Sequence, residues 1–325
     1  MTDAQIGVVV IGRNEGARLV ACLASLRPIG LPVVYVDSGS TDGSRDVARE
    51  AGAAVVALDL ARPFTAARAR NEGAAALTHA HPGLRFVQFV DGDCTVAPGW
   101  IGAAAAFLTA EPRYAAACGR RRERFPDASL YNRLADIEWA TPVGDALSCG
   151  GDALFRLEAF GQVGGYDAGL IAGEEPELCS RLRAQGWSIR RLDEEMTAHD
   201  MAMHRVGQWW RRSVRAGFAY AEVSRMTARH GTPVFVREER RALAWGIGIP
   251  AATIALALTV PWLAWLPPLI LAAQVARLTW RRRRGQAPLG YAALMTLGKF
   301  AETEGILRYW RARLGRGRRL IIEYR

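Results

Sequence analysis

Short apolar runs alternate with amphipathic segments along the first hundred residues. The apolar runs, "IGVVVIG" (6–12), "PVVYVD", "AAVVALD" and "RFVQFVD", have the composition and length of β-strands. The segments between them, "EGARLVACLASL", "SRDVAREAG" and "FTAARARNEGAAALTHA", have the spacing of amphipathic helices. This alternation predicts an α/β, Rossmann-like fold, in which a mostly parallel sheet is flanked by helices and the functional loops follow the strand C-termini.

The region from 113 to 200 is less regular but contains a second acidic feature. Glu174 and Glu175 precede Leu178, Leu182 and Trp187, a spacing that predicts a helix beginning at the two acids. Carboxylates are favoured in the first turn of a helix because the helix dipole is positive there.

A long uncharged segment follows, from Ala242 to Ala276. Its 35 residues would form a helix of roughly 53 Å, too long for one crossing of a bilayer core of roughly 30 Å. Pro261 lies near its middle and Pro267 and Pro268 follow, which favours two short helices joined by a bend. We therefore predict a C-terminal apolar helical hairpin that associates with a membrane; the alternative is a buried helical pair in a soluble domain.

Charge divides the chain at the same place. Residues 1–236 carry 26 basic and 27 acidic side chains, whereas residues 237–325 carry 16 and 5, so the whole net charge of +10 belongs to the second part. Arginines flank the apolar segment on both sides, and positive flanks stay cytosolic. The last segment, "KFAETEGILRYWRARLGRGRRLIIEYR", predicts a basic amphipathic tail on an anionic lipid surface rather than a nucleic-acid site. The predicted domains are thus 1–236 and 237–325.

The strand "RFVQFV" runs directly into Asp91-Gly92-Asp93. Two carboxylates at a strand end suit a divalent cation that also contacts substrate phosphates, and Gly92 permits a close approach. The same residues fit the Asp-x-Asp pattern of haloacid-dehalogenase-like phosphatases, in which Asp91 would be the nucleophile. Against that alternative, three predicted strands precede the motif, and the single lysine of the chain, Lys299, lies beyond the apolar segment.

Together these motifs make the chain similar to family 2 glycosyltransferases, which are inverting enzymes of the GT-A class. The resemblance covers most of residues 6–220, in "VVVIGRNEG", "VVYVDSGSTDGS", "ARARNEGAA", "FVDGDCTVAPGW", "GGDALFRLEAFGQVGGYD" and "GEEPELCSRLRAQGW". It implies a GT-A fold and transfer of a sugar from a nucleoside-diphosphate sugar to a hydroxyl acceptor. The C-terminal part resembles that of membrane-associated bacterial members.

The resemblance assigns the donor site and its metal. Asn14, Glu15, Asp37 and Arg70 match positions that contact the nucleotide. The segment 91–93 matches the family's DxD motif, so that Asp91 and Asp93, separated by Gly92, are expected to hold Mg²⁺ or Mn²⁺ against the donor diphosphate. Some members add a histidine to the metal site, for which His199 is preferred over His204 because Asp200 adjoins it.

The resemblance also assigns the catalytic base and the acceptor side. The family's base sits in an acidic pair, usually Glu-Asp; here the pair is Glu174-Glu175, so Glu175 occupies the position of the base with one extra methylene. Gly151 and Asp152 match the acceptor-side segment. The expected acceptor is a sugar or a lipid-linked molecule, and the expected location is the cytoplasmic face of the inner (plasma) membrane, in cell-envelope or exopolysaccharide synthesis.

Overall fold

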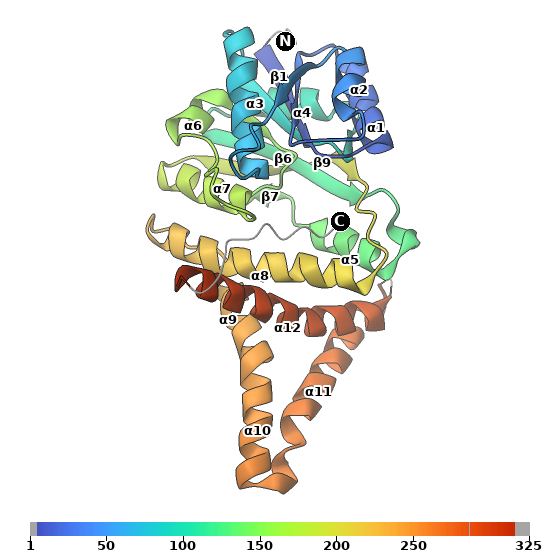
Figure 1. The fold of residues 1–325 in the computed structure, drawn as a ribbon, viewed down its shortest axis with the longest axis vertical. Helices are drawn as coiled ribbons and strands as arrows, with labels where there is room; N and C mark the ends of the chain where they lie inside the picture. The colour runs from blue at the N-terminus through green and yellow to red at the C-terminus, as the bar shows by residue number, and fades with distance from the viewer. Residues whose placement is uncertain (1–4, 286, 316–325) are drawn as a thin grey trace. The chain divides into compact units, whose positions relative to one another are not determined.

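The computed structural model describes residues 5–285 and 287–315, which divide into two compact units (Figure 1). The first unit consists of the chain up to Phe125, of Ala135–Ala202 and of His230–Thr232. The second consists of Pro126–Leu134, Met203–Arg229 and the chain from Pro233 onward. The helix at Val206–Ala228 thus belongs to the second unit, whereas the predicted domain boundary at residue 236 placed it in the first.

A nine-stranded mixed sheet forms the first unit. Its order is β3-β2-β1-β4-β8-β6-β9-β5, with the short β7 paired to β9. The strands are β1 (Ile6–Gly12), β2 (Val33–Asp37), β3 (Ala54–Ala57), β4 (Phe86–Asp91), β5 (Cys94–Val96), β6 (Tyr114–Glu123), β7 (Gly144–Asp145), β8 (Leu154–Arg156) and β9 (Ser188–His199).

The parallel half of the sheet confirms the predicted strand–helix alternation. In β1 every residue except Gly12 is buried, as expected of a strand that is covered on both faces. Its parallel register places Gly12 beside Asp37 on β2 and Ile11 beside Asp91 on β4. The carboxyl ends of β2 and β4, each with an aspartate, therefore lie at one edge on either side of β1.

The other half of the sheet is mostly antiparallel. Strand β8 pairs antiparallel with both β4 and β6, β6 runs parallel to β9, and β5 pairs antiparallel with β9. These pairings join segments that are far apart in the sequence, and local periodicity did not predict them. They bring the end of β9 next to the segment that follows Asp91.

Helices α1 (Ala17–Leu26), α2 (Ser44–Glu50), α3 (Ala66–Ala80), α4 (Trp100–Ala110), α6 (Leu157–Gln162) and α7 (Glu174–Ala184) complete the first unit, and α5 (Leu130–Trp139) spans the two units. Helix α3 can approach the sheet closely because it has a glycine at its contact point. A Cβ on Gly73 would overlap Val9 and would lie 2.8 Å from Val36. The closeness of α3 positions its arginines near the sheet edge.

The second unit is helical. It contains α8 (Val206–Ala228), α9 (Val236–Leu243), α10 (Ile249–Thr259), α11 (Leu266–Arg281) and α12 (Pro288–Arg313). Helices α8 and α12 touch backbone to backbone, because a Cβ on Gly217 would overlap the carbonyl of Glu302 and one on Gly305 would overlap that of Val214. Part of the predicted basic tail therefore forms a packed helix, and its last ten residues, 316–325, lie outside the described residues.

The predicted apolar hairpin is confirmed as two helices with a bend. Helices α10 and α11 are joined by a short 3-10 turn, η5 (Pro261–Leu263), and their closed end points away from α12 (Figure 1). Among the described residues one helix, Val236–Thr259, is long and apolar enough to cross a membrane. The second leg, α11, has 16 residues, fewer than a crossing normally needs.

Candidate active site

The predicted donor-binding loops lie together at the ends of β1 and β2. The carboxylate of Asp37, which is 1% exposed, accepts hydrogen bonds from the backbone amides of Gly39 (3.2 Å) and Ser40 (3.1 Å). The backbone N–H of Asn14 donates to Ser40 Oγ at 2.9 Å, and the side-chain oxygen Oδ1 of Asn14 accepts from the backbone N–H of Thr41 at 2.8 Å. These bonds tie the loop after β1 to the loop after β2 and so preform one polar surface.

Gly92 lies against the loop that contains Glu15. Its amide donates to the Ile11 carbonyl at 2.8 Å, and a Cβ on Gly92 would lie 3.1 Å from that oxygen and 3.3 Å from Glu15 Cγ. A side chain at position 92 would therefore push apart the ends of β1 and β4. The structure thus shows a packing reason for glycine between the two aspartates.

Arg70 links three acidic residues from distant parts of the chain. Its side chain, 3% exposed, places Nη2 2.7 Å from Asp91 Oδ1. Nη1 lies 3.0 Å from Glu174 Oε1 and 3.2 Å from Glu175 Oε1. One buried cation therefore connects the predicted metal motif at the end of β4 with the predicted catalytic pair at the start of α7.

Gly151 provides the space for this arrangement. A Cβ at Gly151 would overlap Nη2 of Arg70 and lie 3.1 Å from Oε1 of Glu175. By contrast, a Cβ on the neighbouring Gly150 would meet nothing within 4 Å. The predicted acceptor-side glycine thus borders the predicted base directly.

Asp152 and Arg121 form the other side of the same network. The Asp152 side chain is fully buried and accepts hydrogen bonds from the Asp91 amide (3.0 Å), Arg121 Nε (2.8 Å) and Thr197 Oγ1 (2.8 Å). Arg121 Nη2 lies 2.7 Å from Asp91 Oδ2. Sequence reasoning missed Arg121, which lies on β6 within the run "RRRE"; that run carries no signal that distinguishes one arginine from the next.

The surroundings of Asp91 and Glu175 shift the pKa values of these two acids in opposite directions. Burial alone raises the pKa of Asp91, but the guanidinium groups of Arg70 and Arg121 more than offset it and hold this pKa well below its ordinary value. For Glu175, burial and then the neighbouring Glu174 raise the pKa to about 7, against a smaller opposing effect of Arg70. Asp91 is therefore a permanent anion, whereas Glu175 can accept and release a proton near neutral pH.

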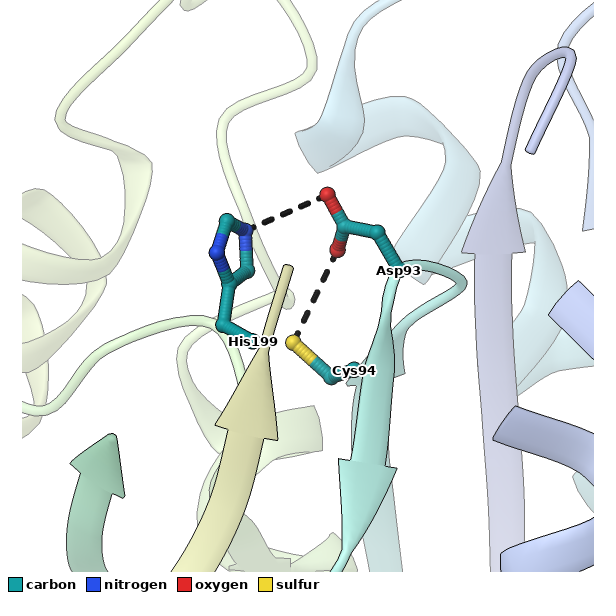
Figure 2. Close-up of side chains that lie close together, drawn as sticks. All are labelled: Asp93, Cys94 and His199. Carbon is teal, nitrogen blue, oxygen red and sulfur yellow. Dashed lines mark hydrogen bonds and ion pairs between the residues drawn. The ribbon is translucent and has the colours of Figure 1, made fainter. Parts of the chain in front are cut away.

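Asp93, Cys94 and His199 form a compact group with metal-ligand chemistry (Figure 2). His199 Nε2 lies 3.1 Å from Asp93 Oδ2, and Cys94 Sγ lies 3.6 Å from Asp93 Oδ1. The antiparallel register pairs Cys94 directly with His199, and the Asp200 amide donates to the Asp93 carbonyl at 3.1 Å. A second group, Asp91, Cys94 and Asp152, adjoins the first through Cys94.

His199 is held as a neutral imidazole. It is 4% exposed, and burial lowers its pKa although Glu123 opposes this effect. Its Nδ1 is buried without a hydrogen-bond partner among the described residues, and the nearest carboxylate oxygen of Glu123 lies 3.8 Å away. A metal-ligating histidine commonly turns its second nitrogen toward a carboxylate, so this environment fits a metal ligand. His204, the other candidate, is exposed.

The fold is the GT-A fold, which it shares with solved structures. The mannosyltransferase PcManGT from Pyrobaculum calidifontis, in complex with GDP-Man and Mn²⁺, is 20% identical, with a TM-score of 0.66 over 95% of this chain and 88% of its own. S. aureus TarS 1–349 is 15% identical, with a TM-score of 0.51 over 97% and 93%. Glucosyl-3-phosphoglycerate synthase from Mycobacterium tuberculosis, with Mn²⁺, UDP-Glc and phosphoglyceric acid, is 18% identical, with a TM-score of 0.52 over 69% and 80%.

The sequence adds two matches of its own. Residues 7–156 match the family described as Glycosyl transferase family 2. The succinoglycan biosynthesis protein ExoA of Rhizobium meliloti (strain 1021) is 26% identical over 92% of this chain and 88% of its own length. The family 2 match thus covers a little under half of the chain, the similarity to ExoA covers most of it, and together they support a glycosyltransferase. The family match is to glycosyltransferases and not to phosphatases, and both oxygens of the nucleophile that a phosphatase would need, Asp91, are bound to arginines.

Proposed function

We propose that this enzyme is a metal-dependent, inverting transferase that moves a sugar from a nucleoside-diphosphate sugar to a hydroxyl acceptor. The observation that carries the proposal is the buried link from Glu175 through Arg70 to Asp91. Through this link Glu175, which can take a proton near pH 7, is connected to the end of β4, where a donor diphosphate would bind. The complexes of the mannosyltransferase with GDP-Man and Mn²⁺, and of the synthase with UDP-Glc and Mn²⁺, support this class of donor and cofactor.

Asp93 and His199 are the residues that would hold the cation. A carboxylate with an imidazole suits Mn²⁺, whereas Mg²⁺ prefers a shell made entirely of oxygen ligands. Asp91 remains a predicted third ligand: a carboxylate has about four lone-pair sites, so its two arginine contacts leave room for a cation. When bound, the metal would neutralise charge on the leaving nucleoside diphosphate.

The donor nucleotide is assigned to the preformed loop surface that contains Asn14, Glu15 and Asp37. In that position Asp37 would contact the base or ribose. Arg70 and Arg121, both beside Asp91, are close enough to the strand end to orient the diphosphate. Their own charge is balanced by the carboxylates of Asp91, Glu174, Glu175 and Asp152, so these contacts fix the geometry of the site.

Glu175 is assigned as the base. A base works best when its pKa lies near the working pH, and burial next to Glu174 supplies that condition. It removes the proton from the acceptor hydroxyl, and the acceptor oxygen bonds to C1 of the sugar as the bond from C1 to the diphosphate breaks. The attack comes from the face opposite the leaving group, so one displacement inverts the configuration. Gly151, next to Glu175, leaves room for Arg70 beside the base.

We further propose that the enzyme acts at the cytoplasmic face of the plasma membrane in the synthesis of an exopolysaccharide or another envelope polymer. The relative ExoA is a succinoglycan biosynthesis protein, and the helix Val236–Thr259 is long enough to cross a bilayer. Attachment to the membrane favours a lipid-linked acceptor, since enzyme and acceptor then share one surface.

The test is a thermal-shift screen of the full-length protein against UDP, GDP, dTDP and CDP sugars, with and without Mn²⁺, followed by a product assay. We expect one nucleotide series to stabilise the protein in a metal-dependent way. Glu175→Gln should keep that stabilisation and lose transfer. Absence of stabilisation by every donor, or full transfer by Glu175→Gln, would overturn the assignment.

A further inference from the structure

The second unit contains a cavity at the base of the apolar hairpin, and none of its lining residues belongs to the candidate active site. It has a volume of about 200 Å³ and is lined by side chains of α9, η4 (Ala244–Gly248), α11 and α12, including Arg241, Trp245, Gln274, Tyr291 and Lys299. A second hollow, of about 370 Å³, shares Arg241 and Trp245 with it and is lined further by Arg237 and Arg240. Arg241 and Trp245 thus lie between two adjoining spaces. We call these two spaces together the root pocket.

The charge of the root pocket is positive and incompletely balanced. Among the described residues the Arg241 side chain has no ion-pair partner. Two acids on the helices that line the pocket are already paired: Glu239 Oε1 lies 2.8 Å from Arg225 Nη2, and Glu302 Oε2 lies 2.6 Å from Lys299 Nζ. An anion that enters the pocket could therefore pair with Arg241 without displacing a protein carboxylate from it.

The pocket also offers neutral donors and an apolar wall. The Tyr291 ring lies against Arg282, whose Cζ is 4.1 Å from the ring centroid, and Trp245 lines both hollows. Leu278 and Met295 complete the lining with apolar surface. Arginine with aromatic N–H and O–H groups is the donor set that binds phosphate oxygens, while the apolar side chains suit the chain that such a headgroup carries.

The position of the pocket indicates what kind of anion it takes. It lies at the open end of the hairpin, next to α12, whereas the closed end of α10 and α11 points away (Figure 1). Along the hairpin the apolar side chains are exposed: Leu258 is 80% exposed, Trp262 71% and Ile254 61%. A soluble phosphate would pair with the basic side chains of the pocket and leave the apolar surface of the hairpin in water. A lipid would contact the basic side chains with its headgroup and cover the apolar surface with its acyl chains.

We propose that the root pocket binds the phosphate headgroup of an anionic membrane lipid, with its acyl chains along α10 and α11. The proposal rests on the membrane attachment proposed above but not on the transfer reaction, since no residue of the active site takes part. It gives the enzyme a preference for anionic bilayers and a fixed depth at the surface.

The experiment uses the full-length protein in non-ionic detergent, titrated with a fluorescently labelled phosphatidylglycerol and followed by anisotropy. We compare the wild type with Arg241→Gln, and with Arg283→Gln as the control. Both arginines are exposed and both changes remove one positive charge, but Arg283 contacts Trp280 and does not line the pocket. Unlabelled phosphatidylglycerol, phosphatidylcholine and inorganic phosphate serve as competitors.

We expect Arg241→Gln to raise the dissociation constant about tenfold, the effect of one lost charge-assisted contact, and Arg283→Gln to raise it less than about threefold. Arg241→Lys should recover part of the affinity. Phosphatidylglycerol should displace the probe, and phosphatidylcholine should not. Equal weakening by the two glutamine variants would show diffuse attraction and overturn the proposal, as would displacement by inorganic phosphate alone.

A parallel flotation assay with neutral phosphatidylcholine vesicles tests membrane attachment through the apolar hairpin independently of headgroup binding in the root pocket. Wild type and Arg241→Gln should both float, because the apolar hairpin is unchanged. Failure of both to float would refute membrane attachment and the lipid site together, and it would leave the transferase assignment to be judged by its own assay.

Discussion

Replacing Glu175 by glutamine should make the protein more stable at alkaline pH while it abolishes transfer. Burial and the adjacent Glu174 raise the pKa of Glu175 from 4.5 to about 7, so the folded protein binds this proton more tightly than the unfolded chain does. The resulting stability is fully present below pH 4.5 and is lost as the pH rises through about 7. Above that pH the ionised carboxylate is a net cost to folding.

The size of that cost follows from the same values. The interval between 4.5 and about 7 corresponds to about 3 kcal/mol, since one pKa unit is about 1.4 kcal/mol. The Glu175 side chain is 15% exposed, so solvent screens part of the interaction, and we expect about 1–2 kcal/mol. For a chain of 325 residues, with an unfolding entropy of about 2.1 cal/mol/K per residue, that corresponds to a rise in melting temperature of roughly 1–3 °C.

The assay compares wild type and Glu175→Gln by thermal melting at pH 5.5 and pH 8.5, with a chelator and without donor. The variant should melt higher at pH 8.5, and the difference should shrink at pH 5.5, where wild-type Glu175 is mostly protonated. In parallel, the wild-type rate should fall about tenfold per pH unit below about 7, because the protonated base is inactive. A melting difference that does not change with pH, together with a flat rate profile, would refute the reasoning.

Three further changes probe the neighbouring contacts. Gly151→Ala should displace Arg70 and cost about 1–3 kcal/mol of stability with loss of donor binding, whereas Gly150→Ala should be neutral; equal denaturant midpoints for the two would contradict the close contact. Arg70→Gln should destabilise by about 3–5 kcal/mol, because it leaves Glu174 and Glu175 without their cation and Asp91 with Arg121 alone; an unchanged melting curve would count against this. Asp93→Asn should lose stabilisation by Mn²⁺ yet keep that by nucleotide alone, and a preserved metal response in calorimetry would remove Asp93 from the ligand set.

Local pattern was sufficient to predict the parallel half of the sheet and the hairpin. Apolar strands that end in Asp37 and Asp91 could be identified from sequence because parallel strands with intervening helices leave a periodic signature. The bend at Pro261 was predicted for an equally local reason. The acidic pair at the start of α7 was predicted from the apolar spacing that follows it.

The rest of the site depends on pairings between distant strands. Arg121 meets Asp91 because β8 stands between β4 and β6, and no local feature of "CGRRRE" shows which arginine turns inward. The role of Asp152, which accepts a hydrogen bond from the Asp91 amide and two more from β6 and β9, is equally non-local. Glu123 comes near His199 through the β6–β9 register, which periodicity alone does not specify.

The pairing of β5 with β9 has a consequence for how this enzyme could change over time. Cys94 lies opposite His199, so the contact between Asp93 and His199 depends on register and not on the length of chain between them. Loops in that interval can lengthen or shorten, and acceptor preference can diverge with them, while the contact stays in place. Inserting a single residue within β9 itself would turn His199 to the opposite face of the sheet. We therefore expect insertions among descendants of this sequence to accumulate in the loops between these strands and to be absent from the paired strands themselves.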